Sequence, residues 1–305
     1  ALKGRRLIGI ADPHLRADAN YSVHADAASR GLLVRTAAND ADFVGECWPG
    51  ASGYVDTLNP AAREWWRRLY SAGGHSDGAA STAGEGEAAV DGRWPTWMHA
   101  WNDMNEPSVF DGPELTLPRD TLHNLGPAAG AGAGAAGGGD GADATVAPGS
   151  SAGPASARYV EHRLVHNAYG ALQASATWKG LEDRATERPF LLSRAFFIGS
   201  ARHGAAWTGD NSASWDHLRL AASMVLSLGI SGMIFAGADV GGFFGDPDPE
   251  LLVRWYQLGA IQPFYRSHAH LDSPRREPWM LPKPEADAAV GAIRERQRLL
   301  PYWNT

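Results

Sequence analysis

The sequence predicts a parallel α/β fold of the (β/α)8 TIM-barrel class, and two observations support this. Short apolar runs alternate with helical segments along the chain, and this alternation is typical of a parallel sheet flanked by helices. Most of the apolar runs end in an acidic, basic or amide side chain, and barrel enzymes build their active sites at the C-terminal ends of their strands. Because we count only about six strands, we expect a partial barrel whose first strands precede residue 1.

The alternative α/β architecture is a doubly wound sheet. Its dinucleotide-binding form carries a Gly-rich phosphate loop after the first strand, and this sequence has none at that point. Residues 237–242 are rich in glycine, but they lack the spacing and the helix context of a dinucleotide motif. The barrel is therefore the favoured interpretation.

Each expected strand is a short apolar run, which is typical of a buried strand in a parallel sheet. We expect strands at residues 7–11, 32–34, 94–102, 189–194, 205–211 and 232–239. Each expected helix has either an apolar face or a recognisable cap. We expect helices at residues 22–30, 61–70, 159–178, in a segment ending at 228, and at 249–260 and 286–300. The expected N-terminal caps are Asn59, Ser214 or Asp216, and Asp248.

Two segments differ from the rest of the chain in composition. Residues 71–92 are rich in Gly, Ala and Ser, and we expect a mobile surface loop there. Residues 126–157 consist almost entirely of Gly and Ala with some Ser, Pro and Asp, and such a segment cannot offset its ordering entropy by burial. We expect a disordered insertion within one catalytic domain over residues 1–305, because the periodic pattern resumes afterwards.

Composition limits the classes of partner. The net charge of -7 and the pI near 5.9 argue against a nucleic-acid partner. No apolar run reaches the roughly 20 residues needed to cross a bilayer, so we expect no membrane insertion. Twelve Trp and eight Tyr fit a carbohydrate or another flat ligand, although core packing also uses such residues. The single cysteine, Cys47, excludes an internal disulfide.

The strand ends collect polar and aromatic side chains that could form one site. The polar candidates are Asp12, Asp103, Arg194, Asp210, Asp239 and His268, and the aromatic ones are Trp48, Trp101, Trp207 and Phe243. Two carboxylates that face each other across an aromatic pocket are the arrangement used in glycoside hydrolysis. One carboxylate attacks or stabilises the anomeric carbon, and the other gives its proton to the leaving oxygen.

Two other kinds of site stay open on the residues alone. A zinc hydrolase would use the carboxylate and imidazole ligands that zinc accepts. Its candidate ligands are Asp12, His14, Asp239, His268 and His270. A non-enzymatic alternative is a carbohydrate-binding module or an inactive relic of an enzyme.

Several residues have an ordinary structural interpretation. We expect His24, His75, His123 and His162 to be surface residues, and His166 to be a packing or capping group. Trp65 and Trp66 lie on an expected helix and are predicted to belong to the core.

Longer motifs show a family resemblance. The segment Trp101-Asn-Asp-Met-Asn-Glu-Pro resembles the nucleophile signature of glycoside hydrolase family 31, and residues 194–211 look like the acid/base region of that family. Residues 237–244, 251–257 and 268–279 are similar to the subgroup that trims glucose from N-glycan precursors in the endoplasmic reticulum. The resemblance covers most of the chain outside residues 71–92 and 126–157.

The resemblance implies a retaining exo-α-glucosidase that removes α-1,3-linked glucose. Asp103 matches the nucleophile and Asp210 the general acid/base, so we expect their carboxyl groups about 5–5.5 Å apart. The residues matching the sugar-binding subsite are Asp12, Arg194, Asp239 and His268, with an aromatic wall of Trp48, Trp101, Trp207 and Phe243 beside Ile10 and Met104.

The same resemblance implies a location and a set of partners. It implies a carbohydrate substrate, a non-catalytic β subunit as partner and the lumen of the endoplasmic reticulum, with no cofactor and no metal. Its alternatives are a family 31 enzyme acting on α-1,4-glucans and an inactive sugar-binding fragment.

Overall fold

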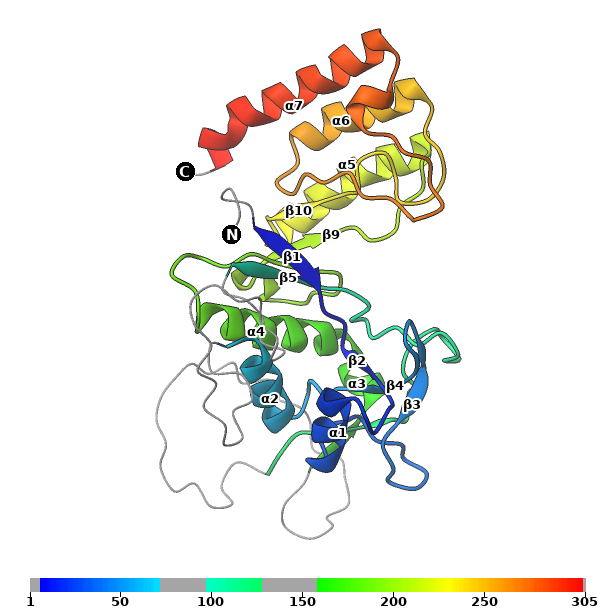
Figure 1. Ribbon diagram of the computed structural model, residues 1–305, viewed down its shortest axis with the longest axis vertical. Helices are drawn as coiled ribbons and strands as arrows, with labels where there is room; N and C mark the ends of the chain where they lie inside the picture. Colours follow the sequence, from blue (N-terminus) through cyan, green and yellow to red (C-terminus); the bar gives the residue numbers. More distant parts are fainter. Residues whose placement is uncertain (1–5, 72–96, 128–157, 304–305) are drawn as a thin grey trace. The chain divides into compact units, whose positions relative to one another are not determined.

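The computed structural model describes residues 6–71, 97–127 and 158–303 (Figure 1). Apart from residues 71, 126 and 127, the predicted loop at 71–92 and the predicted insertion at 126–157 lie outside the described residues. The chain divides into two compact units. The first unit comprises Ala1–Ala11, Pro95–Asp103 and Ala185–Thr305, and the second comprises Asp12–Trp94 and Met104–Arg184.

A five-stranded parallel sheet forms the centre of the first unit (Figure 1). Its strands, in spatial order, are β1 (Leu7–Ile10), β5 (Met98–Asn102), β8 (Leu191–Ser193), β9 (Ala205–Trp207) and β10 (Ala236–Gly237). Ile10 lies opposite Trp101 in the register, and Asn102 lies opposite Ser193. The C-terminal ends of neighbouring strands therefore meet at one edge of the sheet, and the predicted parallel α/β arrangement is confirmed.

The first unit has three long helices (Figure 1). They are α5 (Trp215–Ile230), between β9 and β10, and α6 (Pro249–Ala260) and α7 (Lys283–Trp303), which follow β10. The short helix η3 (Ser200–Arg202) lies between β8 and β9, and η4 (Pro278–Met280) lies between α6 and α7. Ser214 caps α5 by accepting from the backbone N–H of His217, whereas Asp216 lies in the first turn. Asp248 caps α6 as predicted. Trp255 and Ala289, both fully buried, belong to one apolar cluster that joins α6 to α7.

The second unit contains two small antiparallel sheets. One has the order β2 (His14–Arg16), β4 (Gly50–Tyr54) and β3 (Val44–Cys47), and the other pairs β6 (Leu122–Asn124) with β7 (Tyr159–Glu161). Its helices are α1 (Ser22–Ser29), α2 (Pro60–Tyr70), α3 (His162–Val165), η2 (His166–Ala168) and α4 (Tyr169–Glu182).

Close packing of α2 on α4 holds much of the second unit together. The side chain of Asn59 caps α2 as predicted, by accepting from the N–H of Ala61. Trp66 is 4% exposed, and its indole N–H donates to the Thr177 hydroxyl at 2.8 Å. A Cβ at Gly180 would lie 2.3 Å from the carbonyl oxygen of Arg67. The helices therefore approach each other so closely at this point that only glycine fits.

Three predicted elements differ from the structure. The helix expected at 159–178 is wrong in its first part, because residues Tyr159–Glu161 pair with β6 as a strand. The strand expected at 32–34 is wrong, since only Leu33 forms an isolated bridge, to Val55. The strand expected at 232–239 is reduced to Ala236–Gly237. Tyr159–Glu161 form a strand because they pair with β6, which is distant in the sequence and is not visible in a local helical pattern.

The prediction that His123 and His162 lie on the surface is also wrong. His123 is 0% exposed and His162 is 2% exposed. Both rings are hydrogen-bonded to other side chains of the second unit. Buried polar rings need such partners, and these partners come from segments that are far apart in the sequence.

Candidate active site

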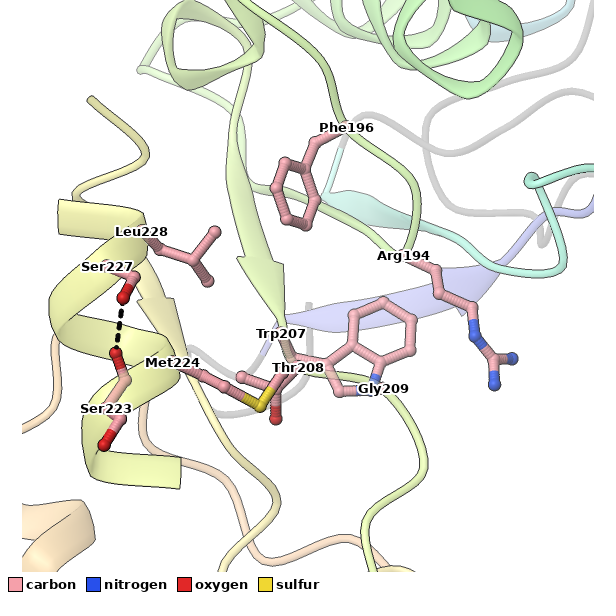
Figure 2. Close-up of a pocket in the computed structure, with 9 residues that line it drawn as sticks. All are labelled: Arg194, Phe196, Trp207, Thr208, Gly209, Ser223, Met224, Ser227 and Leu228. Carbon is pink, nitrogen blue, oxygen red and sulfur yellow. Dashed lines mark hydrogen bonds between the residues drawn. The ribbon is translucent and has the colours of Figure 1, made fainter. Parts of the chain in front are cut away.

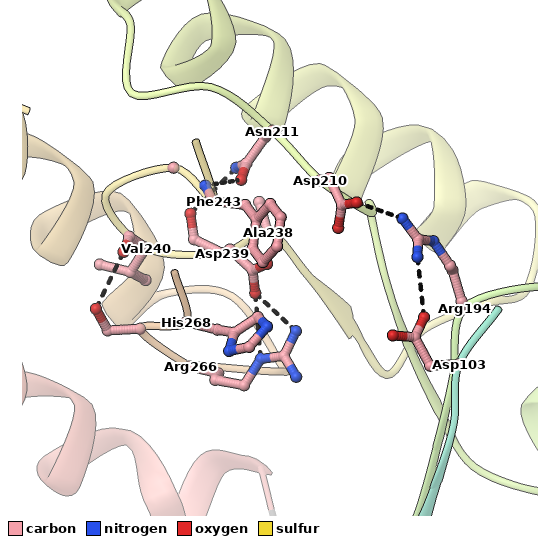
Figure 3. Close-up of polar contacts among 12 residues, drawn as sticks. Asp103, Arg194, Asp210, Asn211, Ala238, Asp239, Val240, Phe243, Arg266 and His268 are labelled. Carbon is pink, nitrogen blue, oxygen red and sulfur yellow. Dashed lines mark hydrogen bonds and ion pairs between the residues drawn. The ribbon is translucent and has the colours of Figure 1, made fainter. Parts of the chain in front are cut away.

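Two carboxylates and one guanidinium meet at the C-terminal edge of the sheet (Figure 3). Asp103 follows β5, Arg194 follows β8 and Asp210 lies in the loop after β9. Arg194 donates through Nη1 to Asp103 Oδ1 at 3.0 Å and through Nη2 to Asp210 Oδ2 at 2.6 Å. The three side chains are 18–30% exposed, so solvent reaches this pair of carboxylates.

A second ion pair, between Asp239 and Arg266, lies near the first. Asp239 is 0% exposed, and Arg266 Nη2 and Nε donate to its Oδ1 at 2.8 and 3.1 Å. Burial raises the pKa of Asp239 to about 6, and the neighbouring Arg266 opposes this shift. Sequence reasoning missed Arg266, because the pairing depends on a bridge between the segments that carry the two residues.

Aromatic rings line the same region of the first unit. The rings of Trp101 and Trp207 lie edge to face with centroids 5.4 Å apart, and the Arg266 guanidinium lies over both, at 4.5 and 5.1 Å. The ring of His268 lies 5.3 Å from Trp101 and 5.2 Å from Phe243. Burial lowers the pKa of His268 to about 4, with Arg266 as a further cause, so this imidazole is neutral near pH 7.

Asn211 holds the loop that carries Asp239 and Phe243. Its amide nitrogen donates to the carbonyl oxygen of Asp239 at 3.1 Å, and its amide oxygen accepts from the N–H of Phe243 at 2.9 Å (Figure 3). Gly242 has a φ of 84°, and a Cβ there would lie 2.4 Å from the backbone nitrogen of Ala213. The side-chain amide of Asn211 therefore fixes the loop. Any residue other than glycine at position 242 would be strained.

Three buried polar atoms at this site have no hydrogen-bond partner among the described residues. They are Asp239 Oδ2, Trp101 Nε1 and Trp207 Nε1. An unpaired buried polar group costs about 1–3 kcal/mol. One acceptor and two donors in an aromatic setting suit a ligand that carries hydroxyl groups, because a hydroxyl can both donate and accept.

Arg194, which binds both carboxylates, also lines an apolar cavity of about 500 Å³ (Figure 2). It is lined by Arg194, Phe196, Trp207, Thr208, Gly209, Ser223, Met224, Ser227 and Leu228. It shares Arg194 and Trp207 with the site, but neither Asp103 nor Asp210 lines it. We therefore place the candidate chemistry at the carboxylates and not in this cavity.

The remaining predicted site residues have separate surroundings. Ile10 is 54% exposed at the end of β1. In the second unit, Asp12 Oδ2 lies 3.6 Å from His14 Nε2, and Trp48 is 68% exposed with its ring 4.8 Å from that of Phe110. Met104 is buried with a φ of 53°, in the left-handed region that side chains other than glycine rarely adopt. The place of these residues in the site stays a prediction.

The zinc alternative has no supporting geometry within the described residues of either unit. Across residues 6–71, 97–127 and 158–303, no three His, Cys, Asp or Glu side chains are grouped as ligands of one metal ion.

In the described part of the chain, no helix is both long enough and apolar enough to cross a bilayer.

Replacing Arg266 tests the buried ion pair. Arg266→Gln is expected to lower the free energy of unfolding at pH 7.5 by about 3–5 kcal/mol, because it leaves the buried Asp239 carboxylate without its counter-charge. The loss should shrink at pH 5, since Asp239, with its pKa raised to about 6, is then largely protonated. Urea unfolding at the two pH values measures both effects.

The matched control for this variant is Arg254→Gln. Arg254 pairs with Glu250 at 3.5 Å, and both side chains are more than half exposed. Such a pair contributes about 0–1 kcal/mol, so little change is expected at either pH. Equal losses in the two variants would contradict the role given to Arg266.

Comparison with known proteins places the chain in a family. The family described as "Glycosyl hydrolases family 31 TIM-barrel domain" matches residues 1–305, which confirms the predicted barrel class. Human neutral alpha-glucosidase AB is 45% identical over 100% of this chain, and a probable glucan 1,3-alpha-glucosidase of Oryza sativa subsp. japonica is 46% identical over 99%.

Solved structures agree with this assignment. A crystal structure of a glucosidase II alpha subunit, in an alpha3-Glc2-bound form, is 41% identical, covers 96% of this chain and gives a TM-score of 0.75. A heterodimeric complex of ER glucosidase II is 42% identical, covers 98% of this chain and gives a TM-score of 0.77. The chain spans only 27–28% of the length of these four relatives.

Proposed function

This chain belongs to glycoside hydrolase family 31, and from that premise we propose that the protein containing it is a retaining exo-α-glucosidase. The proposal includes one catalytic domain over residues 1–305, since the family's barrel domain matches this range. The observation that carries the proposal is the single guanidinium of Arg194, which binds both Asp103 and Asp210. Carboxylates that share one guanidinium are close together, as the retaining mechanism requires.

The proposed reaction has two steps. In the first, a carboxylate oxygen of Asp103 bonds to the anomeric carbon, and the bond from that carbon to the leaving oxygen breaks as Asp210 protonates the leaving oxygen. In the second, Asp210 takes a proton from water, whose oxygen replaces Asp103 on the anomeric carbon. Two inversions at that carbon release α-glucose, with a β-glucosyl ester on Asp103 as the intermediate.

The glucose would be held by the polar and aromatic groups of the same edge. We propose that Arg194, Asp239 and His268 bind hydroxyl groups. The aromatic wall would be formed by Trp101, Trp207 and Phe243 beside Ile10. The unpaired Oδ2 of Asp239 and the unpaired indole N–H groups support this, because they match the donors and acceptors of a sugar.

The relatives support a finer assignment of substrate, partner and location. One related structure holds alpha3-Glc2 and another is a complex with the binding domain of a regulatory subunit. We therefore propose that terminal α-1,3-linked glucose on N-glycan precursors is the substrate. The proposal includes a non-catalytic β subunit as partner and action in the lumen of the endoplasmic reticulum.

The stereochemistry of the first product tests the proposal. The complete protein is incubated with an aryl α-glucoside, and the anomeric proton of the released sugar is followed by NMR. We expect α-glucose first and β-glucose only later, through mutarotation, because the double displacement retains configuration. If β-glucose is released first, or if no sugar is released, the retaining mechanism is refuted.

A pair of disaccharides then tests the linkage. Nigerose, which is α-1,3-linked, is expected to give a higher kcat/KM than maltose, which is α-1,4-linked. The reverse order would refute the α-1,3 assignment while leaving the mechanism intact.

A further inference from the structure

A chain of three imidazole rings runs from a buried carboxylate in the second unit. Asp56 Oδ1 lies 2.7 Å from His123 Nδ1, His123 Nε2 lies 2.9 Å from His162 Nδ1, and His162 Nε2 lies 2.8 Å from His166 Nδ1. Asp56 lies between β4 and α2, His123 on β6, His162 at the start of α3 and His166 in η2. None of the four belongs to the proposed catalytic site.

The hydrogen bonds of Asp56 determine which nitrogen donates in each hydrogen bond between the three rings. Its carboxylate also accepts from the backbone N–H of Asn124 at 2.7 Å and of Leu58 at 3.1 Å. An ionised carboxylate only accepts, so His123 donates from Nδ1, and in the neutral ring its Nε2 accepts. His162 and His166 must then also donate from Nδ1, and only the Nε2 of His166 is left to receive a proton.

Burial increases along the row of rings from His166 to His123 and Asp56. The side chain of Asp56 is 2% exposed and that of His123 is 0% exposed. His162 is buried, whereas His166 is partly exposed. The ring that can take up a proton is therefore the one that reaches solvent, and the carboxylate that would balance the charge is at the closed end.

We propose that Asp56, His123, His162 and His166 form a proton relay, which carries one proton from solvent at His166 to a buried imidazolium–carboxylate pair at His123 and Asp56. A proton adds to His166 Nε2, and the His166 Nδ1–H bond breaks as a bond from H to His162 Nε2 forms. The His162 Nδ1–H bond then breaks as a bond from H to His123 Nε2 forms. His123 becomes the cation, and His162 and His166 end neutral with their protons on Nε2.

The surroundings favour the positive charge on His123, the ring next to Asp56. Burial lowers the pKa of His162 to about 3, and burial also lowers the pKa of His166. A cation is therefore disfavoured on these two rings. At His123 the adjacent carboxylate of Asp56 compensates the charge, and a buried charge is tolerated only with such a partner.

Other charged and titratable groups near the relay come from three elements. On α2, Arg63 interacts with Asp56 through space and donates to the carbonyl oxygens of Thr57 and Leu58. In the loop before β6, Glu114 acts on His166 and is itself paired with Arg119. On α4, the hydroxyl of Tyr169 donates to the carbonyl oxygen of Val55, and burial raises its pKa far above neutral.

Spectra of the ring nitrogens test the relay. The complete protein is labelled with [15N]histidine, and long-range 1H–15N spectra are recorded from pH 9 to pH 5. At high pH, all three rings are expected to carry their proton on Nδ1. On acidification, His162 and His166 are expected to exchange their pyrrole-type and pyridine-type nitrogen signals together, while both nitrogens of His123 become protonated in the same step.

Two substitutions assign the signals and test the path. In His166→Gln an amide N–H can still donate to His162 Nε2, but no ring can pass a proton inward, so His162 and His123 should keep the Nδ1–H form throughout. His24→Gln, in the same unit but outside the relay, should leave the exchange unchanged. An imidazolium on His166 alone, separate midpoints for the three rings, or no change in the wild type would overturn the proposal. The wild-type series decides the matter even if His166→Gln fails to fold.

Discussion

Asp103→Ala is expected to lower kcat/KM for an aryl α-glucoside by about 10⁴-fold or more, as removal of a covalent nucleophile does in other hydrolases. Asp103 is our proposed nucleophile because its segment resembles the nucleophile signature of family 31, and it shares Arg194 with Asp210. Without its carboxylate no glycosyl ester can form, and water in the vacated space is a poor substitute. The measurement is initial rate in the complete protein.

Azide rescue makes this variant diagnostic. Added azide should enter the space left by the carboxylate and attack the face opposite the leaving group, so that an activated α-glucosyl substrate gives β-glucosyl azide. Asp287→Ala is the control, because Asp287 is an exposed carboxylate on α7 that pairs with Lys283 on the surface. Full activity in Asp103→Ala, or loss of activity in the control, would contradict the assignment.

Asp210→Ala is expected to lower kcat/KM by about 10²–10⁴-fold, the usual contribution of a general acid/base. The loss should depend on the leaving group. A glucoside with an alkyl leaving group needs protonation and should lose most, whereas glucosyl fluoride or a dinitrophenyl glucoside should lose least in the first step. A plot of rate against leaving-group pKa measures this dependence.

The product of azide rescue separates Asp210 from Asp103. With Asp103 intact, the glycosyl ester still forms, and azide then attacks it from the face where Asp210 stood. The product should be α-glucosyl azide, the opposite anomer to that from Asp103→Ala. The same azide anomer from both variants would show that one of the two roles is misassigned.

The local features of the fold were predictable because they depend on neighbouring residues. Asn59 and Asp248 cap α2 and α6 as expected, since a cap is formed by a side chain and an N–H only a few positions away. The strands that carry Asp103, Arg194 and Asp210 were predicted from short apolar runs with polar ends. Parallel pairing then brings these ends together, and the resemblance to family 31 selects Asp103 and Asp210 among the polar residues there.

The other features depend on contacts that no local pattern encodes. Arg266 binds the buried Asp239 only because the two segments form a bridge in the folded chain. His123 and His162 read as surface residues in the sequence, yet they lie inside the second unit in a chain of rings that ends at Asp56. A charged or polar side chain can be buried only where a partner compensates it, and only the tertiary structure decides which partner is within reach.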